Sequence, residues 1–158
     1  MPTTDRPLVA GRRRLNGLAA LLCLLLLVQF FLGMITNLYV TIPGSHPGAG
    51  DRDFFAGAPA AIGWAVGSGP AWLAVHAALG MALAAGSLGF IVVAFRARDW
   101  MWTRLSFAAS MQIIGAGFNG ASFLVFGHDF SSLIMAGLFA SSLGCYLAGI
   151  YFGSRRAQ

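Results

Sequence analysis

Four long apolar runs, with almost no charge inside them, constrain this 158-residue chain more than any other feature. They cover about residues 15–40, 71–95, 103–126 and 131–152. A helix needs about 20 mostly apolar residues to cross the ~30 Å hydrocarbon core of a bilayer. Lipid cannot hydrogen-bond exposed backbone groups, and runs of this length without alternation exclude barrel strands. The sequence therefore predicts an all-α, integral membrane four-helix bundle of up-down-up-down order, forming a single domain over residues 1–158.

The composition excludes several classes of soluble protein. Only 9% of the residues are charged, against roughly 25% in soluble domains. The ten basic residues are all arginine and stand in short clusters between apolar runs, so they form no basic face for nucleic acid. The two cysteines lie in separate apolar runs without a CxxC motif, which excludes a disulfide framework, a zinc ribbon and a dithiol site. The expected partner of the chain is the lipid bilayer.

The arginines predict how the chain is oriented, because basic residues are retained on the cytoplasmic side. Only Arg52 falls in the connection of residues 41–70. All the others fall on the opposite side of the predicted spans: Arg6, Arg12, Arg13, Arg14, Arg96, Arg98, Arg104, Arg155 and Arg156. We therefore expect a multi-pass protein of the cytoplasmic (inner) membrane with both termini in the cytoplasm. Residues 41–70 and 127–130 would then form the outer connections.

The start of the chain resembles a secretory signal peptide, since GRRR precedes an apolar run. The run continues for about 26 residues, however, and no A-x-A-like cleavage site closes it. An uncleaved first helix is the expected outcome. Between the second and third spans, Trp100 and Trp102 are expected to anchor a tight turn at the membrane interface.

Small residues recur at helical spacing in two of the spans. We expect them to pack helices against one another within the bundle, because helix association in lipid relies on close backbone approach. Cys23 and Cys145 are expected to be buried free thiols at similar depth. The small-residue rows comprise Ala78, Ala82 and Gly86 in the second span, Gly137, Ser141, Cys145 and Gly149 in the fourth, and beside the latter Ala136, Ala140, Gly144 and Ala148.

Polar side chains of the spans gather toward the predicted outer half. Each is costly in lipid unless it faces the bundle interior. In the third span, Gln112, Gly115, Asn119 and Ser122 follow a 3-4-3 spacing and share one helix face. The sequence therefore predicts an outward-facing polar pocket whose base lies near Gln29 and Gln112. Its expected members are Asn37, His76, Gln112, Asn119 and His128.

The connection of residues 41–70 is long for a helix bundle, and such loops tend to be functional or disordered. Its first part is rich in turn residues and contains His46. Its second part, DFFAGAPAAIGWAVG, predicts a short interfacial helix with Asp53 as its N-cap. This helix is either a lid over the polar pocket or a surface anchor, and the sequence favours neither.

All three histidines fall on the predicted outer side, which suggests a haem or metal site. For haem b, His76 and His128 would be axial ligands at one level, with Asn37, Gln112 and Asn119 around the cofactor. For a copper or zinc ion, His46, His76 and His128 would be ligands, and Asp129 a ligand or a hydrogen-bond partner. In a third interpretation, His76 only hydrogen-bonds to Asn37, Asn119 or Gln112, and Asp129 caps the fourth span.

Other functional classes find less support. No GxSxG motif is present, so a serine hydrolase is disfavoured. The inner half offers no charged or amide lining for a transport pathway. The competing hypothesis to a cofactor protein is a non-catalytic scaffold or accessory subunit, acting as a homo-oligomer or within a larger membrane complex.

Three stretches carry a resemblance to known sequences: FLGMITNLYVTIPGSHPG, LAVHAALG and FNGASFLVFGHDFSSLIMAG. Together they resemble an uncharacterised family of small four-span membrane proteins from high-GC bacteria. That resemblance implies a four-span fold and brings no activity, ligand or site residue. Histidines at the outer face of a four-helix bundle are also similar to those of small b-type cytochromes, which is an architectural likeness from which function does not follow.

Overall fold

The computed structural model describes the backbone of residues 6–155 and the side chains of residues 11–155. Residues 6–155 form five helices: α1 (Arg6–Tyr39), α2 (Phe54–Gly67), α3 (Ala71–Arg96), α4 (Trp100–Phe126) and α5 (Phe130–Arg155). All except α2 are long and apolar enough to cross a membrane. The predicted all-α membrane bundle is confirmed, and the protein is a multi-pass membrane protein.

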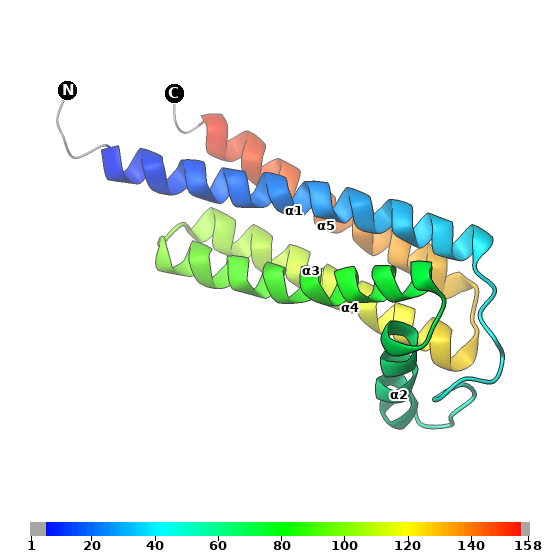
Figure 1. Ribbon diagram of the computed structural model, residues 1–158. Coiled ribbons are helices and arrows are strands. Elements are labelled where there is room, and N and C mark those ends of the chain that lie inside the picture. The colour runs from blue at the N-terminus through cyan, green and yellow to red at the C-terminus, as the bar shows by residue number, and fades with distance from the viewer. Residues whose placement is uncertain (1–5, 156–158) are drawn as a thin grey trace.

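The four long helices pack side by side in alternating directions (Figure 1). Each contacts the next along the chain, and α5 returns to α1, so they close a ring in the order α1, α3, α4, α5. The start of α1 and the end of α5 lie at the same end of the bundle as the turn between α3 and α4 (Figure 1). The short helix α2 lies across the bundle axis at the opposite end.

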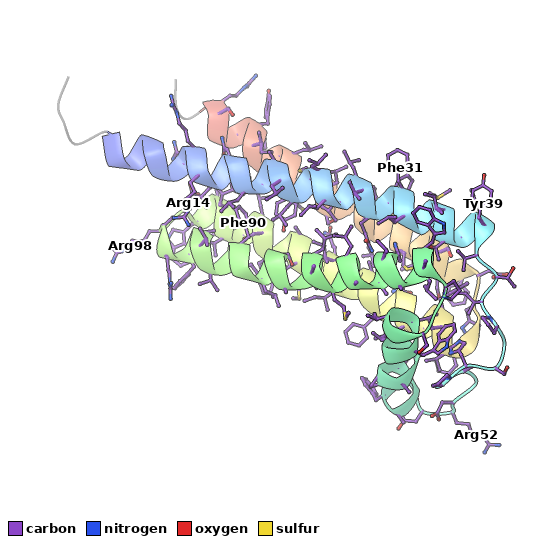
Figure 2. All side chains as sticks on the ribbon, viewed as in Figure 1. Arg14, Phe31, Tyr39, Arg52, Phe90 and Arg98 are labelled. Atoms are coloured by element: carbon purple, nitrogen blue, oxygen red, sulfur yellow. The ribbon has the colours of Figure 1, made fainter. Side chains whose placement is uncertain are left out.

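The arginines are divided between these two ends. In Figure 2, Arg14 and Arg98 lie at one end and Arg52 at the other. We call the first the arginine end and the second the α2 end. The side chain of Arg6 and all of Arg156 lie outside the described part of the chain. The arginine end is defined by Arg12, Arg13, Arg14, Arg96, Arg98, Arg104 and Arg155.

Most of the outer surface of the bundle consists of apolar side chains. Within the most apolar window of each long helix, only 17–33% of the residues are buried inside the protein. Leu24, Phe31 and Leu38 of α1 are each more than half exposed. Exposing so much contiguous apolar surface to water would be unfavourable, whereas contact with lipid chains is not. The long helices of the bundle therefore contact the lipid bilayer.

Local sequence signals explain where several helices begin and end. The Asp53 carboxylate accepts the backbone N–H of Phe55 at 2.9 Å, which confirms its predicted role as the N-cap of α2. Asp99 caps α4 in the same way, accepting from the backbone N–H of Trp102 at 3.2 Å. At the other end of α4, Gly127 adopts φ 69°, a left-handed conformation that favours glycine.

The predicted short helix is present as α2, and it packs on α3 and α4. Its buried face consists of Ala58, Ala61 and Ala65, which meet an apolar patch formed by Leu73, Ala121, Leu124 and Val125. The preceding loop is tied to α4, because the Gly50 backbone N–H donates to the Val125 carbonyl at 2.7 Å. This packing fixes α2 to the flank of the bundle.

Trp102 departs from the prediction that it anchors the turn at the membrane interface. Its side chain is fully buried and stands edge-on to Phe90, with ring centroids 5.3 Å apart. Gly149 of α5 lies against the indole ring, so the absence of a side chain there makes room for the largest buried residue in the arginine half. Trp100, two residues earlier, is 63% exposed. The turn is therefore flanked by one exposed and one buried tryptophan.

The small-residue rows also lie differently from the prediction. On α3, Ala78, Ala82 and Gly86 are exposed, and on α5 most of the row is exposed as well. Gly149, and Gly153 one turn later, are buried in the closely packed interior, and Cys145 packs against the same core. The expectation that these rows hold the bundle together is therefore wrong for most of their members, because larger side chains fill the interior. The exposed members on α5 are Ala136, Gly137, Ala140, Ser141 and Gly144.

The contact between Gly149 and Trp102 gives a direct test of the packing. Gly149→Ala would place a methyl group against the rigid indole ring, so we expect a loss of about 1–3 kcal/mol in stability. Gly144→Ala, on the same helix with nothing within 4 Å, is the matched control and should be neutral or slightly stabilising. Thermal unfolding in detergent measures both. Equal stability of the two variants would contradict this packing.

Candidate functional site

Gln29 and His76 form the central polar contact between α1 and α3. The Gln29 side-chain amide donates to the His76 backbone carbonyl at 3.0 Å, and its Nε2 lies 3.4 Å from the imidazole Nε2. Two glycines allow this approach: a Cβ on Gly33 would lie 3.0 Å from His76 Cε1, and one on Gly80 would lie 3.0 Å from Gln29 Nε2. We refer to Gln29, Gly33, His76 and Gly80 as the Gln29–His76 cluster.

The cluster leaves hydrogen-bonding capacity unused. Gln29 Oε1 and His76 Nδ1 are both buried, and neither has a hydrogen-bond partner in the described part of the protein. Thr36 Oγ1 and Gln112 Oε1 are buried and unpartnered in the same way. An unpartnered polar atom is costly in an interior that lipid surrounds. The cluster can therefore accept a further polar group or a water molecule at the imidazole.

The amides predicted to share a pocket with His76 have separate partners. Asn37 is exposed, and its Oδ1 accepts a hydrogen bond from the Ser132 hydroxyl of α5 at 3.2 Å. Asn119 donates to the carbonyl of Gly115, one turn earlier on its own helix, at 2.9 Å. His76 instead contacts Gln29, which was predicted only as the bottom of the pocket.

The other two histidines lie on aromatic surfaces outside the bundle interior. The His46 ring stacks on Trp64 of α2, with centroids 4.3 Å apart, and its Nδ1 lies 3.0 Å from the Pro47 carbonyl. His128 is exposed and stacks between Phe126 and Phe130, at 5.7 and 5.3 Å. Each of these imidazoles therefore lies on its own aromatic surface at the α2 end.

Asp129, predicted as a metal ligand or a helix cap, is exposed. The backbone N–H groups of Ser131 and Ser132 donate to the carbonyls of His128 and Asp129, at 3.0 and 3.1 Å. The first turn of α5 is thus closed by the backbone. Across residues 6–155, no three His, Cys, Asp or Glu side chains are grouped so that they could hold a metal ion.

The depths of His76 and His128 follow from the register of α1 against α5. Contacts join Asn16 to Gly153, Phe30 to Phe139, and Asn37 to Ser132. The two helices are therefore antiparallel, and each residue further along α1 is level with one residue earlier in α5. Gly33, which touches His76, is therefore level with residue 136. α5 begins at Phe130, six positions or roughly 9 Å before that level at 1.5 Å per residue, and His128 precedes the helix. The two imidazoles lie at different depths.

Buried polar side chains at the arginine half were not foreseen as a group. Ser106 and Ser142 are fully buried, and each hydroxyl donates to a carbonyl three residues earlier on its own helix. The Tyr146 hydroxyl is buried beside the Ser110 side chain. Asn16 Oδ1 and Trp102 Nε1 both lie beside Gly153 and are buried with no hydrogen-bond partner among the described residues. The repeat of glycines at 149 and 153 was the one sequence signal for this close packing. Cys23 and Cys145 are free thiols in the same core.

Comparison with protein-family models gave no match, and neither did comparison with curated proteins or with solved structures. The class of the protein is therefore defined by its fold, as a small membrane protein with four spans and one short helix across the bundle axis.

Proposed function

We propose that the protein is a non-catalytic accessory or scaffold subunit of a larger assembly in the cytoplasmic membrane, and that α5 contacts its partner. The observation that carries this proposal is the chemical contrast between two exposed helix faces. The exposed face of α1 consists of large residues, including Leu24, Phe31 and Leu38. The middle of the exposed face of α5 consists of Ala, Gly and Ser over residues 136–144.

Small residues on an exposed face favour a partner helix over lipid. A lipid chain packs as well against leucine as against alanine, so contact with lipid alone does not select small side chains. A second helix does, because its backbone can approach closely only where side chains are small. A Cβ at Gly137 or Gly144 would have no described atom within 4 Å beyond its own stretch of α5, so this face is open.

A rigid bundle suits such a role, and polar contacts tie α1 to each of the other spans. Gln29 contacts His76 on α3, and Asn37 accepts from Ser132 on α5. Arg12 Nε lies 3.9 Å from the carboxylate of Asp99, the residue that caps α4. Interhelical hydrogen bonds in membranes contribute roughly 0.6 kcal/mol each on average. Their value to a scaffold is the fixed register that they impose on α1.

Variants of the α5 face test the proposal. Gly137→Leu combined with Gly144→Leu should reduce the size of the solubilised complex, because the added side chains would keep a partner helix away. Gly117→Leu, on α4 with equally open surroundings, is the matched control and should leave the complex unchanged. Native gel electrophoresis of gently solubilised membranes measures the size. Cross-linking of the purified chain distinguishes a second copy from a different partner, and an unchanged size for the double variant would overturn the proposal.

The proposed orientation places both termini in the cytoplasm, and the arginine end supports it through the positive-inside rule. A cysteine introduced at Ser45, exposed at the α2 end, should react with an impermeant thiol reagent on intact cells. Ser154→Cys, exposed at the arginine end, should react only after lysis. The opposite labelling pattern would reverse the orientation.

A second candidate function is the binding of a cofactor at His76, either haem b or a copper or zinc ion. It is favoured by one observation, the buried imidazole nitrogen Nδ1 that lacks a partner beside an equally unpartnered Gln29 Oε1. Because His46 and His128 stack on aromatic rings elsewhere, this candidate relies on His76 as its single histidine ligand.

The cofactor candidate predicts a Soret absorbance band in protein produced with ample haem, or a stoichiometric metal in elemental analysis. His76→Leu should abolish either signal, because it removes the ligating nitrogen while keeping an apolar side chain that a membrane helix tolerates. His128→Leu is the control and should preserve the signal. Wild-type protein with neither haem nor metal would eliminate this candidate.

A further inference from the structure

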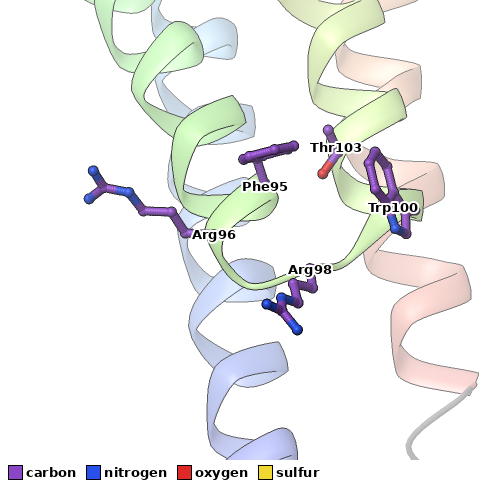
Figure 3. A pocket seen from close by; sticks show the side chains of 5 residues that line it. All are labelled: Phe95, Arg96, Arg98, Trp100 and Thr103. Atoms are coloured by element: carbon purple, nitrogen blue, oxygen red, sulfur yellow. The ribbon is translucent and has the colours of Figure 1, made fainter.

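The turn between α3 and α4 forms a hollow of about 350 Å³ at the arginine end. Its lining combines two exposed aromatic residues, two arginines and one threonine: Phe95, Arg96, Arg98, Trp100 and Thr103 (Figure 3). The rings of Phe95 and Trp100 stand edge to face with centroids 6.0 Å apart, and both side chains are at least 60% exposed. Aromatic residues at a helix end are typical of the headgroup level of a bilayer.

The backbone of the turn sets the position of Arg98. Its φ is 53°, and within residues 6–155 it is the one residue other than glycine with a positive φ. The Arg98 N–H donates to the Phe95 carbonyl at 3.0 Å, and the Asp99 N–H donates to the Ala94 carbonyl at 3.2 Å. In Figure 3 the Arg98 side chain leaves the turn between the two aromatic residues and runs away from the bundle. A left-handed arginine is unfavourable, so the turn places a cation there against the local preference.

The two arginines that line this hollow form no ion pair with an acidic side chain of residues 11–155. Asp99 is the acidic residue of the turn, and it is already engaged by the Trp102 N–H and by Arg12. The other acidic side chains among residues 11–155 belong to the α2 end: Asp51 and Asp53 precede α2, and Asp129 precedes α5. Within that part of the chain, Arg96, Arg98 and Arg104 therefore have no acidic partner.

The polarity of the hollow changes with depth. On the bundle side lie Phe95, Trp100 and Thr103, and the Thr103 hydroxyl is already used, since it donates to the Asp99 carbonyl at 2.9 Å. On the other side of the turn lies the Arg98 guanidinium (Figure 3). A second hollow shares Trp100 as its wall and adds Arg104 and Phe152, so the arginine and aromatic surface continues toward α5. A free anion would match only the outer part, whereas an amphiphile matches both.

We propose that this hollow binds an anionic phospholipid, with the phosphate at the Arg98 guanidinium and an acyl chain along Phe95 and Trp100. A guanidinium offers two parallel N–H donors that match a phosphate, and the unpartnered charge of Arg96 and Arg104 favours an anionic over a zwitterionic headgroup. The hollow lies at the arginine end, away from the Gln29–His76 cluster. Lipid binding there does not require a partner at α5.

The test is the binding of dioleoylphosphatidylglycerol to the purified full-length chain in detergent, measured by native mass spectrometry, with dioleoylphosphatidylcholine as the comparison lipid. Arg98→Gly removes the guanidinium and relieves the left-handed turn, so the bundle stays folded. We expect about tenfold weaker binding of phosphatidylglycerol, the equivalent of one charge-assisted hydrogen bond. Arg14→Gln, exposed at the same end but outside the hollow, should change the affinity less than about threefold.

Arg98→Lys separates a phosphate site from diffuse attraction, because lysine keeps the charge and loses the two-pronged donor. We expect its affinity to fall between those of the wild type and Arg98→Gly. Equal losses for Arg98→Gly and Arg14→Gln would show nonspecific surface charge and overturn the proposal. Displacement of the lipid by millimolar inorganic phosphate would show a free-anion site and overturn it as well, as would equal affinity of the wild type for the two lipids.

Discussion

A polar group inside a bilayer must find its partner within the protein, and the arrangement of α1 depends on this constraint. Lipid offers no hydrogen bonds, so an isolated amide or imidazole in a span is costly. The Gln29 side-chain NH2 group finds its partner at His76, while Asn37 contacts α5 and Arg12 contacts the cap of α4. The glycines at 33 and 80 make the first of these contacts possible. Polar chemistry, and not apolar packing alone, fixes the register of α1.

Local features of the sequence were sufficient to predict the main elements of the fold. Apolar runs of membrane length predicted the four spans, and Asp53 predicted the start of α2. Each of these signals is local, since a span is recognised by its own length and a cap by its own turn. Which face of a helix points inward cannot be predicted from that helix alone. It depends on neighbouring helices, and hydrophobic periodicity is weak when both lipid and protein interior are apolar.

That weakness explains the two main errors. Trp102 was predicted to be interfacial because it is close to the turn. It is buried instead, because Gly149 on another helix leaves room for its indole ring. Small residues on α5 read as the bundle interface, yet they face outward. The same limit applies to the polar pocket, where the spacing placed Asn37 and Asn119 with His76 but could not show that each has its own partner. Contacts between helices distant in sequence decided the burial of Trp102 and the partner of Asn37, whereas Asn119 donates to its own helix.

The length of α1 has a mechanical consequence for the surrounding bilayer. From Leu15 to Tyr39 this helix is uncharged, and at 1.5 Å per residue it extends about 37 Å, beyond the ~30 Å of a typical hydrocarbon core. A free helix would relieve this mismatch by tilting alone. Because α1 is held to its neighbours α3 and α5, and to the turn before α4 through Arg12, the bundle tilts as one body or the bilayer thickens around it.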